Sequence, residues 1–270
     1  MKRDVLTASV VICCGALTIF AQQPAARFPW PDGKRVALSL SFDDGRASQV
    51  EGGAALLDRH GVKATFYVTP SAVEPRLDAW KRVAAAGHEI ANHSLNHPCS
   101  GNFPWSRGKA LEDYTLDQMA REMAEANSRI SALLGVTPES FAYPCGQTFV
   151  GRGVTTQSYV PVAAKLFVTS RGWLDEAPND PEYVDFAQLT GIESDGKDLD
   201  EIVPLIESAA KTGMWVVLAG HDMRASGSQA TRLAMLDQLC AYVTNPANGV
   251  WVAPVGTVAR YVGDHRARPH

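Results

Sequence analysis

The 270-residue sequence has no strong excess of charge, no low-complexity tract and no linker-like run of proline and serine. Its 25 basic and 29 acidic side chains leave a formal net charge of -4, so we expect no nucleic-acid partner. Cysteine is scarce, with five residues and no CxxC pair, which argues against a structural zinc knuckle. With 46% hydrophobic residues, the chain can bury one large globular core.

Long apolar runs are absent except for one at the N-terminus. Lys2 and Arg3 precede an apolar stretch over residues 5–20, which is short for a membrane span of about 20 apolar residues. We therefore expect residues 1–21 to be a cleaved secretory signal and the exported protein to begin near Gln22. A retained N-terminal anchor is the alternative. After signal cleavage we expect no stable membrane span.

No composition shift divides the rest of the chain. We predict a single domain over residues 34–262, preceded by an N-terminal extension at 22–33 and followed by a C-terminal tail at 263–270. This length suits one large core, and we find no internal repeat.

Short β-branched runs alternate with longer amphipathic stretches along this domain. The predicted strands cover residues 36–42, 64–68, 88–92, 140–143, 164–169, 214–219 and 250–253. The predicted helices cover residues 49–60, 77–86, 116–134, 199–211 and 230–243. Such alternation favours an α/β fold with a parallel sheet covered by helices, either closed into a barrel or open.

Polar residues follow several of the predicted strands. Asp43 and Asp44 follow the first, His93 follows the third, residues 143–146 close a later one, and His221 follows the strand at 214–219. The carboxyl ends of parallel strands gather on one face, where active sites are built. We therefore expect these side chains to meet although they are far apart in the sequence.

His93, His97 and one of the adjacent carboxylates Asp43 and Asp44 are candidate ligands of one divalent metal ion. Two imidazole nitrogens and a carboxylate oxygen suit Zn²⁺, and Co²⁺, Ni²⁺ or Mn²⁺ fit the same donors. The second carboxylate is then left over to handle protons. Structural roles are the alternatives, because aspartate pairs are common in turns and helix N-caps, and histidines also occur in cores and on helix surfaces.

Five segments resemble the successive motifs of one known family: SFDDG, HGVKATFYV, GHEIANHSLNHP, FAYPCGQ and VVLAGHD. The chain thus resembles the NodB-homology polysaccharide deacetylases, carbohydrate esterase family four, over about residues 34–261. The resemblance implies a distorted (β/α) barrel, usually of seven strands, and metal-dependent removal of acetyl groups from carbohydrate. It also implies that Asp43 is the base, His221 the acid, and Asp44, His93 and His97 the metal ligands.

Further site residues follow from the same resemblance. It places the main-chain N–H of Cys145 as the donor to the tetrahedral oxyanion and Leu218 beside the acetyl methyl group. Tyr143, in the loop of Cys145, is expected to contact substrate. Trp173 and Asp175 are the best candidates for a tryptophan and an aspartate that the family carries before its last motif, and Trp173 is expected to contact substrate as well.

The sequence departs from the family pattern at Ala142, where an arginine that braces the catalytic aspartate is usual. Arg171 ends another predicted strand and could supply the missing cation. A solvated surface arginine is the alternative. For His221, the alternative to an acid is a histidine whose ring is satisfied by backbone at the strand end.

Phe103 and Trp105 lie in an irregular segment rich in Gly, Pro and Ser. Sugar rings stack on exposed indoles, so we expect this segment, and Trp105 in particular, to line a saccharide groove. Packing against the edge of the barrel is the alternative.

Three cysteines follow the predicted signal: Cys99, Cys145 and Cys240. The odd number leaves at least one thiol unpaired within the chain. Cys99 and Cys145 fall on segments expected at the same face, so one alternative is a disulfide between them that leaves Cys240 over.

The sequence therefore predicts a metal-dependent enzyme that removes N-acetyl groups from an amino-sugar polymer or oligomer of the chitin or peptidoglycan kind. An esterase acting on O-acetyl groups of xylan-type polymers, or an amidase acting on a small amide, uses the same machinery. A carbohydrate-binding protein without catalysis is the alternative of another class. It has no need of a base and an acid, which argues against it.

Overall fold

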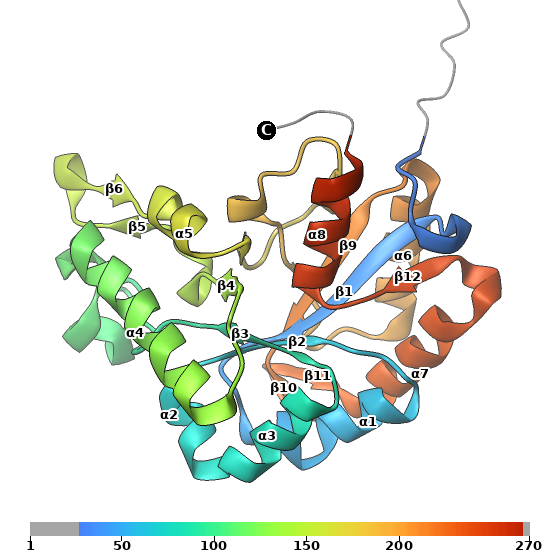
Figure 1. Ribbon diagram of the computed structural model, residues 1–270, viewed down its shortest axis with the longest axis horizontal. Coiled ribbons are helices and arrows are strands. Elements are labelled where there is room, and N and C mark those ends of the chain that lie inside the picture. The colour runs from blue at the N-terminus through green and yellow to red at the C-terminus, as the bar shows by residue number, and fades with distance from the viewer. Residues whose placement is uncertain (1–26, 267–270) are drawn as a thin grey trace, which may run out of the picture.

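The computed structural model describes residues 27–266 (Figure 1). The predicted signal at residues 1–21 lies outside this range, as does the second half of the predicted tail, residues 267–270. No helix between residues 27 and 266 is long and apolar enough to cross a membrane.

A parallel sheet forms the centre of the molecule (Figure 1). Its main path runs β7-β4-β3-β2-β1-β9-β8, and β12 pairs with β1 off that path. The strands are β1 (Val36–Phe42), β2 (Thr65–Val68), β3 (Glu89–Asn92), β4 (Ser140–Ala142), β7 (Thr169–Arg171), β8 (Ile192–Glu193), β9 (Trp215–Gly220) and β12 (Val250–Val252). The seven strands of the path curl into a half-barrel surrounded by helices, which confirms the predicted (β/α) barrel.

Strand β1 lies in the middle of this sheet and is buried along its whole length. A parallel strand covered on both faces reads as a nearly continuous apolar run, and VALSLSF fits that rule except at two serines. Both serines are satisfied: Ser41 Oγ donates to the carbonyl of Leu218 at 2.8 Å, and Trp215 Nε1 donates to Ser39 Oγ at 3.0 Å. The sheet thereby delivers the SFDDG segment to its carboxyl edge in a fixed position.

Most helices cover the outer face of the sheet, and one helix packs on the opposite face (Figure 1). They are α1 (Ala54–Arg59), α2 (Pro70–Val73), α3 (Leu77–Ala85), α4 (Leu116–Leu134), α5 (Val160–Leu166), α6 (Leu199–Thr212), α7 (Leu233–Thr244) and α8 (Val255–His265). Helices α4 and α6 each begin with a capping box and end at a left-handed glycine, Gly135 and Gly213. Two short ribbons complete the fold: β5 (Phe149–Val150) with β6 (Gln157–Ser158), and β10 (Asp222–Arg224) with β11 (Ala230–Arg232).

Two apolar clusters lie on opposite faces of the sheet. The larger joins Leu38, Leu40 and other β1 and β9 residues to the outer helices. The smaller packs α8 against Trp215 and includes Phe28 and Trp30, which belong to the predicted N-terminal extension. Residues before the predicted domain start are therefore part of the core.

Several predicted boundaries differ from the structure. The strand predicted at 164–169 is wrong: α5 occupies Val160–Leu166, and the strand begins only at Thr169. Pro161 in the first turn favours a helix there, as do the alanines that follow it. Residues 230–232 form β11 instead of the start of a helix. Helix α8 was not predicted, and it runs past residue 262, where the domain was expected to end.

Candidate active site

A cavity of about 560 Å³ opens where several strands of the sheet end. The predicted site residues line it, except Leu218, Arg171 and Asp175. Asp43 follows β1, His93 follows β3, Tyr143 follows β4 and His221 follows β9. The convergence predicted from the strand ends is thus present.

Asp44, His93 and His97 turn one ligand atom each toward a common point. The Nε2 atoms of the two histidines are 3.1 Å apart, and Asp44 Oδ1 lies 3.5 Å from the first and 3.4 Å from the second. An ion about 2.0–2.1 Å from each of these atoms fits near the middle of this triangle. With only three protein donors, an ion held here would keep further coordination positions for water and substrate.

The two histidines are oriented in different ways. His93 is buried, and its Nδ1 donates to the carbonyl of Ala142 at 2.9 Å, which leaves Nε2 to face the site. His97 Nδ1 instead faces the sulfur of Cys99 at 3.7 Å. Burial and the nearby His93 lower the pKa of His97 to about 4, so its ring is neutral at neutral pH, as a metal ligand must be.

Arg46 holds the second oxygen of Asp44. Its Nε and Nη2 donate to Asp44 Oδ2 at 3.0 and 2.8 Å, and its Nη1 donates to Asp222 Oδ2 at 2.9 Å. Because Oδ2 is occupied, Oδ1 is the oxygen that faces the histidines. Burial would raise the pKa of Asp44, but His93 and His97 outweigh it and lower this pKa well below the usual range.

Asp43 lies deeper, with 4% of its surface exposed, and pairs through Oδ1 with Nη2 of Arg171. Arg171 ends β7, is fully buried, and lies over the ring of Tyr67 at 4.9 Å. Tyr67 packs with Ala91 and Ala142, whose small side chains leave the barrel interior open to the arginine. Arg171 therefore occupies the place expected for a brace on Asp43, and the surface alternative is wrong.

This pairing keeps Asp43 ionised in spite of its burial. Desolvation would raise its pKa, but the guanidinium of Arg171 and the nearby rings of His93 and His221 lower it. Asp43 is thus a carboxylate ready to accept a proton at neutral pH.

His221 is held by an aspartate that the sequence reasoning missed. Its Nδ1 lies 2.7 Å from Asp195 Oδ2, and its main-chain N–H donates to Asp195 Oδ1 at 3.1 Å. Thr231 Oγ1 also donates to Asp195 Oδ1, at 2.9 Å. Burial alone would lower the pKa of His221, but Asp195, with Asp43 and Asp44, raises it. His221 therefore remains protonated above its ordinary pKa, as an acid catalyst requires.

Asp175 does not take part in this pairing. Its Oδ2 accepts from the main-chain N–H of Gly191 at 2.8 Å, so it braces a loop. The aspartate beside His221 is Asp195, two residues after the end of β8. That strand has only two residues, too few to stand out as a strand in the sequence.

Aromatic and apolar side chains form the rim of the cavity. Trp173 meets the ring of His221 at nearly a right angle with centroids 4.7 Å apart, and Trp105 lies 5.9 Å from the ring of His97. Trp105 is 57% exposed, so the core-packing alternative for it is wrong. Phe103 and Leu174 are also exposed at this rim.

Of the remaining predicted residues, two line the cavity and one does not. Cys145 lines the cavity with a left-handed backbone (φ 55°) and is bonded to Cys99, while Cys240 stays free and buried. Tyr143 reaches the cavity, but its hydroxyl donates to the carbonyl of Ala187 at 2.7 Å. Leu218 belongs to the core cluster facing the outer helices, so the prediction that it lines the acetyl pocket is wrong.

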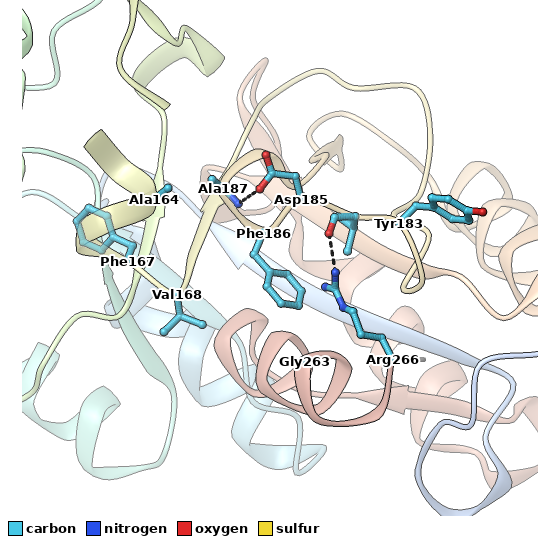
Figure 2. A pocket seen from close by; sticks show the side chains of 10 residues that line it. Ala164, Phe167, Val168, Tyr183, Asp185, Phe186, Ala187, Gly263 and Arg266 are labelled. Carbon is cyan, nitrogen blue, oxygen red and sulfur yellow. Dashed lines mark hydrogen bonds between the residues drawn. The ribbon is translucent and has the colours of Figure 1, made fainter. Parts of the chain in front are cut away.

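A second cavity, of about 660 Å³, lies between α5, α8 and residues 183–187 (Figure 2). Arg266 stacks on Phe186 at 4.1 Å there and donates from Nη1 to the carbonyl of Val184 at 3.2 Å. None of the predicted catalytic residues or metal ligands lines it. Of the two cavities, only the first is lined by the predicted catalytic residues and metal ligands.

Together, the half-barrel fold, a three-ligand site, a buried carboxylate and a histidine–aspartate pair are typical of hydrolases that use a metal ion. The sequence pattern of the family described as polysaccharide deacetylase matches residues 31–169. The chain belongs to this family.

Known relatives agree in fold and in part of the sequence. The chain is 23% identical over 259 residues to a gellan lyase of Bacillus sp, covering 86% of this chain and 10% of the relative. It is 46% identical over 66 residues to the peptidoglycan-N-acetylglucosamine deacetylase PgdA of Listeria monocytogenes, covering 24% of this chain and 14% of the relative. The crystal structure of a putative polysaccharide deacetylase from Mycobacterium smegmatis superposes with a TM-score of 0.65 at 19% identity, covering 92% of this chain and 99% of that one. The chain thus spans a small part of these curated relatives but nearly all of the solved structure.

Proposed function

We propose that the protein is a metal-dependent hydrolase that removes N-acetyl groups from an amino-sugar polysaccharide or oligosaccharide. The observation that carries this proposal is the meeting of Asp43, Asp44, His93, His97 and His221 around one cavity. Membership of the polysaccharide deacetylase family supports it, as does the stretch similar to a peptidoglycan-N-acetylglucosamine deacetylase.

The metal ion would be held by Asp44, His93 and His97, with Zn²⁺ as the expected ion and Co²⁺, Ni²⁺ or Mn²⁺ as others that fit these donors. A bound ion supplies Lewis acidity, which polarises an acetyl carbonyl and makes water more acidic. The chain's own part is to hold one carboxylate oxygen and two neutral imidazoles in fixed positions.

Asp43 and His221 then move the protons. Asp43, ionised beside Arg171, accepts the proton of the attacking water. His221, protonated beside Asp195, gives a proton to the leaving amine nitrogen. The main-chain N–H of Cys145 is the proposed donor to the oxyanion, and the exposed ring of Trp105 is the proposed platform for a sugar.

Acetate release tests this function. Protein loaded with Zn²⁺ is expected to release acetate from chitin oligomers or peptidoglycan, and chelation of the metal is expected to abolish the release. Acetate from acetylxylan alone would favour the O-acetyl esterase instead. Binding of the sugars with no acetate from any of the three would favour a non-catalytic binding protein.

We propose further that the protein is exported. The basic and apolar N-terminal pattern supports this, and so does the Cys99–Cys145 disulfide, because such bonds persist in oxidising compartments. Mass spectrometry of the periplasmic or secreted protein is expected to find an N-terminus near Gln22. An intact Met1 on that fraction would contradict signal cleavage.

A further inference from the structure

The Cys99–Cys145 disulfide joins two loops of the candidate active site. Cys99 lies two residues after the proposed metal ligand His97, and Cys145 lines the cavity as the proposed oxyanion donor. The same two loops are tied once more, since the N–H of Ser100 donates to Gln147 Oε1 at 2.7 Å. The bond therefore connects two functional elements of the site directly.

Both loops carry an uncommon backbone next to the bond. His97 has φ 51° and Cys145 has φ 55°, a left-handed region that costs residues with a Cβ about 1–2 kcal/mol relative to the right-handed one. Such conformations persist where the surrounding structure fixes them, and they cluster at functional sites. The disulfide is one such constraint, because it fixes Cys145 itself and the chain just after His97.

The disulfide also contacts the His97 ring. His93 Nδ1 donates to a carbonyl oxygen, whereas His97 Nδ1 has the sulfur of Cys99 as its neighbour, at 3.7 Å. The partner of the non-ligating nitrogen orients a metal-binding histidine and fixes its tautomer. The position of Cys99 Sγ thus bears on where His97 Nε2 points.

We propose that the Cys99–Cys145 disulfide is a positioning element of the site, so that its reduction weakens metal binding at His97 and displaces the Cys145 N–H. This inference rests on the proposed function. The chemistry is thiol–disulfide exchange with a dithiol reductant. One thiolate of the reductant attacks a sulfur of the Cys99–Cys145 bond, and the second thiolate then displaces it by forming the reductant's own disulfide. The reductant thereby transfers two electrons and two protons to Cys99 and Cys145, which become free thiols. The metal site is therefore sensitive to redox conditions.

Zn²⁺ titration of the metal-free full chain tests this, with the variant C99A/C145A compared with the wild type. We expect the Kd for Zn²⁺ to rise at least about ten-fold, as is typical when a partner of a metal-binding histidine is removed. At saturating Zn²⁺, we expect kcat for acetate release to fall more than KM rises, because the oxyanion donor is displaced. The control L236A removes a buried side chain of α7 that does not line the cavity and should lower thermal stability while leaving the Kd unchanged.

Wild-type protein reduced with dithiothreitol, and freed of the reagent under nitrogen, gives a second route if the double variant does not fold. It is expected to show the weaker Zn²⁺ binding, and reoxidation is expected to restore the original Kd. If the oxidised wild type had the same Kd and kcat as the reduced protein or the C99A/C145A variant, this inference would be overturned and the proposed function would stand. A wild type that binds no Zn²⁺ at all would overturn the proposed function, and this inference with it.

Discussion

Asp43 and Asp44 are neighbours in the sequence, yet they belong to different halves of the site. Asp43 lies in the barrel interior, fully buried and paired with Arg171, whose own side chain is 1% exposed. Asp44 lies at the rim, 27% exposed, and is held by Arg46, which is 25% exposed. One arginine comes from a strand far along the chain and the other from two residues away.

This difference shows how one short motif serves two tasks. The interior half isolates a charge from water, so its pairing is energetically demanding and depends on the whole barrel. The rim half holds the proposed metal ligand Asp44 near solvent, where ion pairs are weaker and a neighbouring residue in the sequence is enough to supply the partner. Substitutions in the interior half are therefore expected to have larger effects than those at the rim.

The largest effect is expected from the two aspartates themselves. Asp43→Asn should keep Zn²⁺ but lose about 10²–10⁴-fold in kcat, because an amide cannot act as a base. Asp44→Ala should lose both Zn²⁺ binding and turnover. Calorimetric Zn²⁺ titration beside acetate release measures both, and full activity in Asp43→Asn would remove it as the base.

Arg171→Met tests the interior pairing. It leaves Asp43 buried without a partner, so we expect the free energy of unfolding to fall by about 3–5 kcal/mol and turnover to fall with it. Urea denaturation measures the first quantity. Adding Ala142→Arg to this variant places a guanidinium where the family usually has one, and we expect it to restore part of the activity. An unchanged stability of Arg171→Met would show that the pair is not needed.

Asp195→Asn tests the acid in the same interior half. The folded-state pKa of His221 is raised, so the acid is present below that pKa and is lost as the pH rises through it. Removing the charge of Asp195 should lower the pKa, and the alkaline limb of the kcat profile should move down by about one pH unit or more. The matched variant Asp175→Asn removes an aspartate that braces a loop, and it should leave that limb in place.

Arg46→Met tests the rim. It frees Asp44 Oδ2, and we expect the Kd for Zn²⁺ to rise about ten-fold with little change in stability, since the ion pair is partly exposed. Arg224→Met is the matched control, because Arg224 Nη2 also pairs with Asp222, at 2.9 Å, but has no bond to Asp44. Equal Zn²⁺ affinity in both variants would show that Arg46 does not position the ligand.

The rim half was also the easier half to predict from the sequence. SFDDG and the histidines of NHSLNHP are local patterns whose spacing indicates a metal site. The alternating elements indicated a parallel sheet covered by helices, and the family resemblance indicated the barrel. Asp195 was missed because it follows a strand of two residues. Leu218 was misplaced because side chains alternate along β9, and its own side chain points to the face covered by the outer helices. Pairings such as Arg171 with Asp43 depend on which strand lies beside which, and one sequence alone does not specify that order.

The smallest effect is expected from Trp105→Ala at the outer rim. The ring is 57% exposed and contributes contact area to a bound sugar but no group to the reaction, so KM should rise while kcat is kept. An aromatic contact of about 0.5–1.5 kcal/mol corresponds to a rise of roughly two- to ten-fold. Tyr183→Ala removes an exposed aromatic ring from the other cavity and should leave KM unchanged (Figure 2). A lower kcat with an unchanged KM in Trp105→Ala would contradict this role. It would show that the ring acts on the reaction through His97, whose ring centroid is 5.9 Å away, and that Trp105 belongs with the catalytic residues.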